Sequence, residues 1–225
     1  MFIYLNIVLD LSEVWALLIP LCVLFFNRKQ PAVLIPVMVY LFLALVLNII
    51  ADSIMLYNSG KELKDMISNN TYYNIHSLVR FVCFCMFFLQ LKQSYFTTIK
   101  KLIPLFWLLF IIINFSFIEQ TGFFSFLYLS GNLLAAEAYL LLVYCMLYYL
   151  SQLREDLQKF KSEKVFWVVT GLAIYVVINF FVFLFYIPML NENESLATRM
   201  WDIHNVAYII FCILLAKAFY VPAKN

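Results

Sequence analysis

The sequence predicts an all-α integral membrane protein with seven transmembrane helices, and two observations support that prediction. The chain of 225 residues is 65% hydrophobic and only 12% charged, with a mean hydropathy of +0.92. Soluble domains carry about 25% charged residues, so an ordinary soluble fold is excluded. Apolar runs of roughly 18 residues or more also recur along the chain, and each can cross a hydrocarbon core of about 30 Å as a helix.

These apolar runs occupy the chain from one end to the other. Their approximate bounds are residues 5–26, 32–57, 73–91, 102–118, 124–150, 165–187 and 201–220. The longest polar stretches, 58–72, 151–164 and 188–200, have only the length of loops. Residues 1–225 are therefore expected to form a single membrane domain without a soluble part.

Four prolines indicate where the helices begin, bend or end. Pro31 and Pro104 lie near the first turn of their runs, where a missing N–H costs nothing. Pro20 lies inside the first run and is expected to kink it. Pro188 is expected to end the run that begins near residue 165.

The basic residues are divided unevenly between the two ends of the runs. If the N-terminus lies outside, eleven Lys and Arg residues lie at or close to the inner side and three lie in outer loops. The inner set is Arg28, Lys29, Lys92, Lys100, Lys101, Arg154, Lys159, Lys161, Lys164, Lys217 and Lys224, and the outer set is Lys61, Lys64 and Arg199. The positive-inside rule predicts an N-out, C-in topology from this bias. The net charge of +2 therefore reflects topology, and no nucleic-acid partner is expected.

The polar residues within the apolar runs occur twice. Glu13, Asn48 and His76 return as Glu137, Asn179 and His204, at offsets of 124, 131 and 128 positions. The only two histidines lie in similar settings, Tyr-Asn-Ile-His-Ser-Leu and Trp-Asp-Ile-His-Asn-Val. The pattern predicts two parallel repeats of three helices, about 1–91 and about 124–220, joined by a connector helix at about 102–118. The alternative is that two aromatic-rich helices entering from the same side resemble each other by chance.

Most of these polar residues are expected at one depth in the membrane. Counted at 1.5 Å per residue, they lie roughly 18–24 Å from the inner surface, and Arg80 lies at the same level with His76 one turn above it. Each ionisable side chain at that depth costs roughly 2.5–3.5 kcal/mol on insertion scales. We therefore expect this layer to face the interior of the bundle, around a polar pocket open to the outside.

The roles of the layer residues stay open from sequence alone. Arg80 can form a structural salt bridge to Glu13 or Glu137, or it can bind an anionic ligand. The two glutamates can serve as structural hydrogen-bonding groups or as a site for a ligand, an ion or a proton. Asn48 and Asn179 are expected to hold helices together and to orient neighbouring side chains.

No cofactor can be named from the sequence. Glu13, His76, Glu137 and His204 have the right chemistry for one or two metal ions, and two histidines at matched depth could flank a b-type haem. Lys217 is a lysine in the seventh run, as in retinal proteins. It lies only five residues before Pro222 and more than ten residues from the polar layer, which argues against retinal.

Two family resemblances accompany these features. The N-out topology with a 3+1+3 repeat is similar to SWEET and PQ-loop transporters, although the Pro-Gln dipeptide is reversed here as Gln30-Pro31. The Trp201-x-x-His204-Asn205 start of the last run resembles the end of seven-helix sensory modules fused to histidine kinases in Bacteroidetes-type bacteria. That resemblance implies a bacterial inner membrane and a separate cytoplasmic signalling partner, since no kinase follows in this chain.

These observations favour a sensor or receptor-like protein that binds a small ligand from the outer side. Glu13, His76, Arg80, Glu137 and His204 are the expected contact residues, and Asn48 and Asn179 are expected to orient them. Only four glycines occur in the chain, so a mostly static cavity is favoured over an alternating-access carrier. A transporter of a small solute or metal ion, a metal- or haem-dependent membrane enzyme and a structural assembly subunit remain as alternatives.

Overall fold

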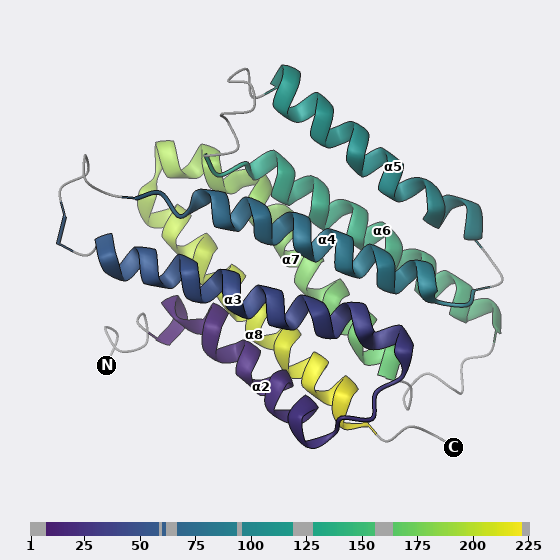
Figure 1. Ribbon diagram of the computed structural model, residues 1–225. Coiled ribbons are helices and arrows are strands. Elements are labelled where there is room, and N and C mark those ends of the chain that lie inside the picture. The colour runs from purple at the N-terminus through teal and green to yellow at the C-terminus, as the bar shows by residue number, and fades with distance from the viewer. Residues whose placement is uncertain are drawn as a thin grey trace.

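The computed structural model describes residues 8–58, 60–61, 67–93, 96–118, 128–155 and 164–221. Every regular element in this part of the chain is helical, so the predicted all-α class is confirmed. The helices run alternately up and down through one bundle, as Figure 1 shows. Their bounds are α2 Ser12–Phe26, η1 Ala32–Leu34, α3 Ile35–Asn58, α4 Asn70–Gln90, α5 Thr97–Ile113, η3 Asn114–Ile118, α6 Gly131–Glu155, α7 Lys164–Glu192 and α8 Glu194–Tyr220.

Six helical segments have the length and composition of membrane spans, so the protein is a multi-pass membrane bundle by these criteria. They are Ala32–Asn58, Asn70–Gln90, Thr97–Ile118, Gly131–Arg154, Lys164–Glu192 and Glu194–Tyr220. The remaining helix, α2, has 15 residues and is shorter than the other spans. At 1.5 Å per residue it covers about 22 Å, and residues 1–7 of the predicted first span lie outside the described residues. The seventh span therefore stays a prediction.

The end of α7 differs from the sequence prediction. Helix α7 continues through Pro188 to Glu192, and α8 begins at Glu194, within the stretch 188–200 that was expected to be a loop. Asn193 makes this possible, because its side-chain Oδ1 accepts a hydrogen bond from the Leu196 amide at 3.1 Å and so caps α8. Glu194 in the first turn adds a favourable charge at the N-terminus of the helix. The two helices therefore form a hairpin with a single residue between them.

The packing of the helices follows a regular pattern. The main neighbours are α2 with α8, α3 with α4, α4 with α6, and α7 with both α6 and α8. Gly171 lets α7 approach α8 closely, since a Cβ at this position would lie 3.0 Å from the Cβ of Leu214. Beneath the polar layer the bundle is filled by buried aromatic rings, among them Tyr40, Phe84 and Phe211.

Side-chain hydrogen bonds tie the segment after α2 to the rest of the bundle. Asn27 Nδ2 and Gln30 Nε2 both donate to the Phe219 carbonyl, at 2.7 Å and 3.1 Å, near the C-terminus of α8. Lys164 Nζ at the start of α7 donates to Gln30 Oε1 at 2.7 Å. These bonds fix the end of α2 against both α7 and α8.

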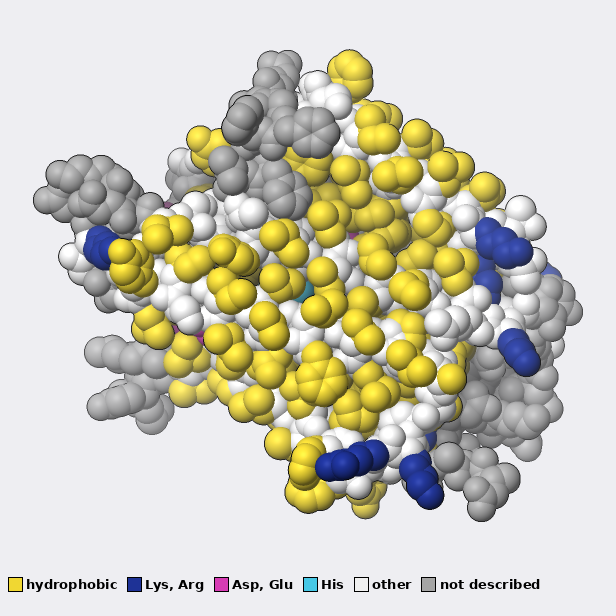
Figure 2. All heavy atoms as spheres, viewed as in Figure 1, with side chains coloured by type: hydrophobic (Ala, Val, Ile, Leu, Met, Phe, Trp, Pro, Cys, Tyr) yellow, Lys and Arg dark blue, Asp and Glu magenta, His cyan; other side chains and the backbone are white. Residues whose placement is uncertain are grey.

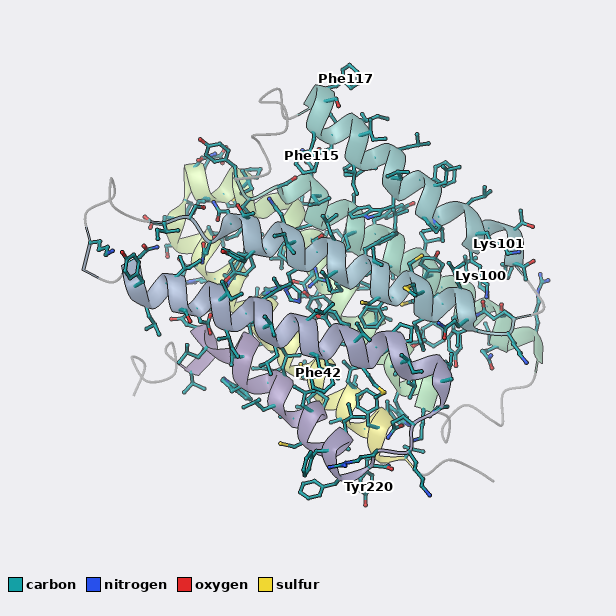
Figure 3. All side chains as sticks on the ribbon, in the orientation of Figure 1. Phe42, Lys100, Lys101, Phe115, Phe117 and Tyr220 are labelled. Carbon is teal, nitrogen blue, oxygen red and sulfur yellow. The ribbon has the colours of Figure 1, made fainter. Side chains whose placement is uncertain are left out.

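Helix α5 lies along the outside of the bundle and is anchored at its start by Lys100 (Figures 1 and 3). Lys100 is only 4% exposed, and its Nζ donates to the carbonyls of Phe88 and Leu91 at 3.1 Å and 2.6 Å, where α4 ends. This ammonium group therefore satisfies the last carbonyls of α4 and complements the negative end of that helix. At the other end of the segment, Phe117 points away from the bundle and is 72% exposed (Figure 3).

The visible face of the molecule is apolar across its middle, and most Lys and Arg side chains on it gather toward one end (Figure 2). At that end α2, α4, α6 and α8 terminate, and α3, α5 and α7 begin. The N-out, C-in topology predicted from the sequence would place this end in the cytoplasm.

The topology can be tested by labelling single cysteines with a membrane-impermeant maleimide, in a background that lacks the native cysteines. If the chain is N-out with seven spans, Arg199→Cys and an N-terminal epitope are accessible in intact cells. Lys29→Cys then reacts only after permeabilisation. An epitope and Lys29→Cys on the same side would show that α2 does not cross the membrane.

Candidate functional site

The seven polar residues singled out from the sequence are all buried in the bundle, none more than 6% exposed. They come from six of the helices: Glu13 from α2, Asn48 from α3, His76 and Arg80 from α4, Glu137 from α6, Asn179 from α7 and His204 from α8. The structure does not gather them around one open pocket. It divides most of them between two hydrogen-bonded networks.

The first network is built on an ion pair between Arg80 and Glu137. Arg80 Nε lies 2.5 Å from Glu137 Oε1, and Nη2 donates to Oε2 at 2.7 Å, which is the bidentate geometry of a strong guanidinium–carboxylate pair. Ser77 Oγ donates to Glu137 Oε2 at 2.7 Å, and Arg80 Nη1 donates to the Tyr175 hydroxyl at 2.6 Å. The pair and its two hydrogen-bonding partners thus link α4, α6 and α7.

The second network is centred on His204. Its Nδ1 is hydrogen-bonded to Asn179 Oδ1, and its Nε2 lies 3.2 Å from Glu13 Oε1. Asn48 Nδ2 donates to the backbone carbonyl of Glu13 at 2.8 Å, which fixes the position of that residue on α2. This network therefore joins α2, α3, α7 and α8 at the level of the first.

The hydrogen bonds of Asn179 determine which nitrogen of His204 carries a proton. Asn179 Nδ2 donates to the Tyr175 carbonyl at 2.8 Å, so its Oδ1 faces His204 and accepts from Nδ1–H. A proton shared by Nε2 and Glu13 Oε1 would lie either on an imidazolium beside a carboxylate or on a carboxyl group beside a neutral ring. Glu13 and His204 thus form an acid–base pair with two forms of different polarity.

His76 belongs to neither network. Its ring stacks on Tyr40, with centroids 5.8 Å apart and ring planes 8° apart. The side chain is 6% exposed, and among the described residues its Nε2 atom has no hydrogen-bond partner. An unsatisfied buried nitrogen is costly in an apolar bundle, so His76 is the residue of the layer best suited to accept a new partner.

A small cavity lies between the two networks. It is lined by Glu13, Tyr73, His76, Arg80, Leu134, Phe183, Trp201 and His204, and its volume is about 10 Å³. A volume of about 10–15 Å³ is the minimum for one water molecule, so this space has no room for an organic ligand or a haem. A larger ligand can reach these residues only if some side chains move.

A second and larger hollow adjoins the cavity at the end of the bundle where α4 and α8 begin. We call it the vestibule; its volume is about 290 Å³, and it is lined by Asn69, Asn70, Tyr73, Leu129, Tyr186, Thr198 and Trp201. Tyr73 and Trp201 line both spaces, and their rings meet edge to face with centroids 5.4 Å apart. These two rings therefore separate the vestibule from the polar residues beneath it.

Several residues of the site were not singled out from the sequence. Tyr175 accepts hydrogen bonds from both networks, through its hydroxyl from Arg80 and through its carbonyl from Asn179. Ser77 lies one turn before Arg80, and Tyr175 one turn before Asn179. Such i, i+3 and i, i+4 spacing to a buried polar residue was the available signal. The sequence pattern placed Tyr73 and Trp201 three positions before His76 and His204 but assigned neither of them a role in the site.

The four expected metal ligands are divided, with Glu13 beside His204 and Glu137 beside Arg80. Across the described segments, no group of three or more His, Cys, Asp or Glu side chains is placed to hold a metal ion. Lys217 lies in the last turn of α8 with its Nζ 3.7 Å from the centroid of the Trp167 ring.

Comparisons with known proteins add no assignment. No family model matches the chain, no curated protein matches it, and no solved structure matches it.

The Arg80–Glu137 pair can be tested with a double-mutant cycle. Arg80→Gln leaves Glu137 buried without its countercharge, so we expect a loss of about 3–5 kcal/mol in the free energy of unfolding. Glu137→Gln is expected to cost a similar amount, and the double variant much less than the sum of the two. Thermal unfolding of the purified protein in detergent measures all three. Additive losses would show that the two side chains are not coupled.

Proposed function

We propose that the protein is a sensor or receptor-like membrane protein that binds a small ligand from the outer side. The single observation that supports this proposal most strongly is the vertical arrangement of two spaces. A vestibule of about 290 Å³ adjoins a cavity lined by Glu13 and His204, and the rings of Tyr73 and Trp201 meet where the two spaces adjoin. The vestibule is close in size to the smaller ligand pockets of proteins.

The ligand first meets the vestibule, where amide and hydroxyl groups lie among aromatic rings. Tyr186 and Trp201 lie with ring centroids 5.1 Å apart on one side of it. When Tyr73 and Trp201 separate, the ligand reaches Glu13, His76 and His204 below. In this proposal these three residues contact the ligand or the water molecules around it.

The remaining polar residues hold the contact groups in place. Asn179 fixes the ring of His204 and Asn48 fixes the backbone at Glu13. Arg80 lines the cavity, but its guanidinium is already bonded to Glu137 and Tyr175. The ion pair therefore has a structural role in the site, and Arg80 does not offer an unpaired charge to an anionic ligand.

Packing below the site favours binding over transport. The rings of Phe88 and Tyr144 stack 4.9 Å apart, and Tyr144 donates from its hydroxyl to the Lys100 carbonyl at 2.7 Å. With the other buried aromatic rings, they fill the half of the bundle that we place toward the cytoplasm. In this proposal the protein lies in the inner membrane of a bacterium. A shift of the helices in this half would transmit the signal to a cytoplasmic partner.

The contacts also support the proposed repeat of three helices. Glu13 on the first helix of one half pairs with α8, the third helix of the other half. Glu137 on the first helix of the second half pairs with α4, the third helix of the first half. Helix α2 packs on α8 and α6 packs on α4, so the first helix of each half contacts the third helix of the other half. A two-fold axis along the bundle would produce this arrangement.

The proposal can be tested through the fluorescence of Trp201, which lines both spaces. A panel of small amines, carboxylic acids, sugars and amino acids is titrated into the purified protein. We expect at least one compound to change the emission, with the change lost in Trp201→Phe and retained in Trp107→Phe. Glu13→Gln should weaken its binding at least ~10-fold, or about 1.4 kcal/mol.

Glu194→Gln is the matched control, because it removes an exposed carboxylate at the same end of the bundle. A compound that binds wild type, Glu13→Gln and Glu194→Gln equally would contradict the proposed site. Uptake of the compound into proteoliposomes, abolished by Glu13→Gln, would instead establish a transporter.

A further inference from the structure

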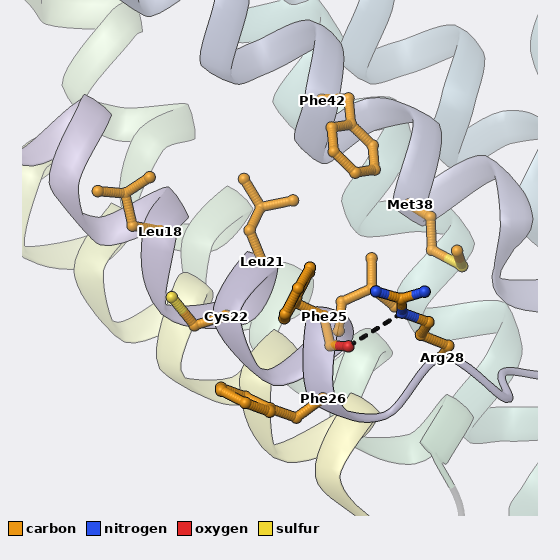
Figure 4. Close-up of a pocket in the computed structure, with 9 residues that line it drawn as sticks. Leu18, Leu21, Cys22, Phe25, Phe26, Arg28, Met38 and Phe42 are labelled. Atoms are coloured by element: carbon orange, nitrogen blue, oxygen red, sulfur yellow. Dashed lines mark hydrogen bonds between the residues drawn. The ribbon is translucent and has the colours of Figure 1, made fainter.

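A groove on the apolar surface, which shares no lining residue with the polar cavity, has a charged end. It lies between α2 and α3, has a volume of about 600 Å³, and is shown in Figure 4. Its walls are formed by Leu18, Leu21, Cys22 and Phe25 on α2 and by Met38 and Phe42 on α3. The one charged residue that lines it is Arg28, just beyond the end of α2.

The groove exists because the two helices pack on different neighbours. Helix α2 lies mainly on α8 and α3 mainly on α4, so α2 and α3 make fewer contacts with each other. Large side chains along the opening stay exposed, with Phe25 64% exposed and Phe42 56% exposed. In a bundle that crosses a membrane, such an opening faces the hydrocarbon of the bilayer.

Arg28 is held over the end of this groove. Its Nε donates to the Phe25 carbonyl at 3.3 Å, and its guanidinium carbon lies 4.9 Å from the centroid of the Phe25 ring. Figure 4 shows the guanidinium turned back toward Phe25 and Met38. Within the described segments no carboxylate forms an ion pair with Arg28, so its remaining N–H groups are free to bind an anion.

We propose that this groove binds an acidic phospholipid of the leaflet at the basic end of the bundle. One acyl chain lies along the apolar wall and the phosphate meets Arg28. The planar guanidinium binds a phosphate through two parallel hydrogen bonds, which a lysine cannot reproduce. Lys29, which is exposed beside it, increases the attraction to an acidic surface.

A lipid fits these observations better than a peptide does. Apart from Arg28, every lining residue is apolar, so the wall has no side-chain partners for the backbone amides of a peptide. A second groove, between α5, α6 and α7, has a volume of about 710 Å³ and no charged residue in its lining. Its apolar lining can bind any acyl chain, whereas the α2–α3 groove also has an arginine that selects an acidic headgroup.

Native mass spectrometry of the detergent-purified protein tests the site with two lipids of identical acyl chains, phosphatidylglycerol and phosphatidylcholine. Wild type is expected to bind the first more tightly at one site. Arg28→Gln should weaken phosphatidylglycerol binding about five- to tenfold and phosphatidylcholine binding less, because the choline ammonium already compensates the phosphate charge of that lipid. Cys22→Phe, which fills the groove, should weaken the binding of both lipids at that site.

Lys101→Gln is the matched control, because it removes an exposed charge at the same end of the bundle, on α5 and outside this groove. It should change phosphatidylglycerol binding less than about twofold. All variants are compared at equal thermal stability and monodispersity. The site is ruled out if wild type binds both lipids equally, if Arg28→Gln and Lys101→Gln weaken binding equally, or if a protein dimer without lipid covers the groove.

Discussion

A guanidinium and a carboxylate that are almost fully excluded from water can stay charged only together, and the Arg80–Glu137 pair meets this condition inside the bundle. The bidentate geometry leaves little freedom in the vertical register of α4 against α6, because a shift of one turn would leave both charges unpaired. Ser77 and Tyr175 complete the hydrogen bonds of the pair and extend the constraint to α7. The other polar contacts are arranged around this fixed point.

Tyr175 connects that fixed point to the acid–base pair. Its hydroxyl accepts from Arg80, its carbonyl accepts from Asn179, and its ring lies edge-on to His204 with centroids 5.8 Å apart. A change of proton position between His204 and Glu13 alters the polarity next to a residue that is held by the ion pair. The two networks are therefore contiguous, and α7 carries the contact between them. Neither α2 nor α8 contributes a residue to the ion pair, so a rearrangement at Glu13 and His204 can occur without breaking it.

The composition and the spacing of apolar runs were sufficient to predict a helical membrane bundle, because each span must satisfy its backbone internally. They were also sufficient to predict that Glu13, Arg80, Glu137 and His204 lie inside it, since none of these groups tolerates lipid. The partners could not be predicted, because Arg80 had two candidate carboxylates at one depth and only tertiary packing distinguishes them. The predicted loop 188–200 was wrong for a local reason: the single cap at Asn193 allows α8 to begin seven residues before the apolar run. The closed state of the polar cavity could not be predicted from the sequence either, because it depends on where the rings of Tyr73 and Trp201 meet.

The relative strength of these contacts indicates how the site can open. An aromatic pair such as Tyr73–Trp201 contributes about 0.5–1.5 kcal/mol beyond the area that it buries, whereas breaking a buried ion pair costs about 3–5 kcal/mol. A ligand in the vestibule that stacks on either ring can replace the first interaction, but a small ligand cannot replace the second. Opening should therefore separate α4 from α8 at the ends where both helices begin, near Tyr73 and Trp201. The junction of α4 and α6 should stay closed, and the motion should be passed to α2 through Glu13.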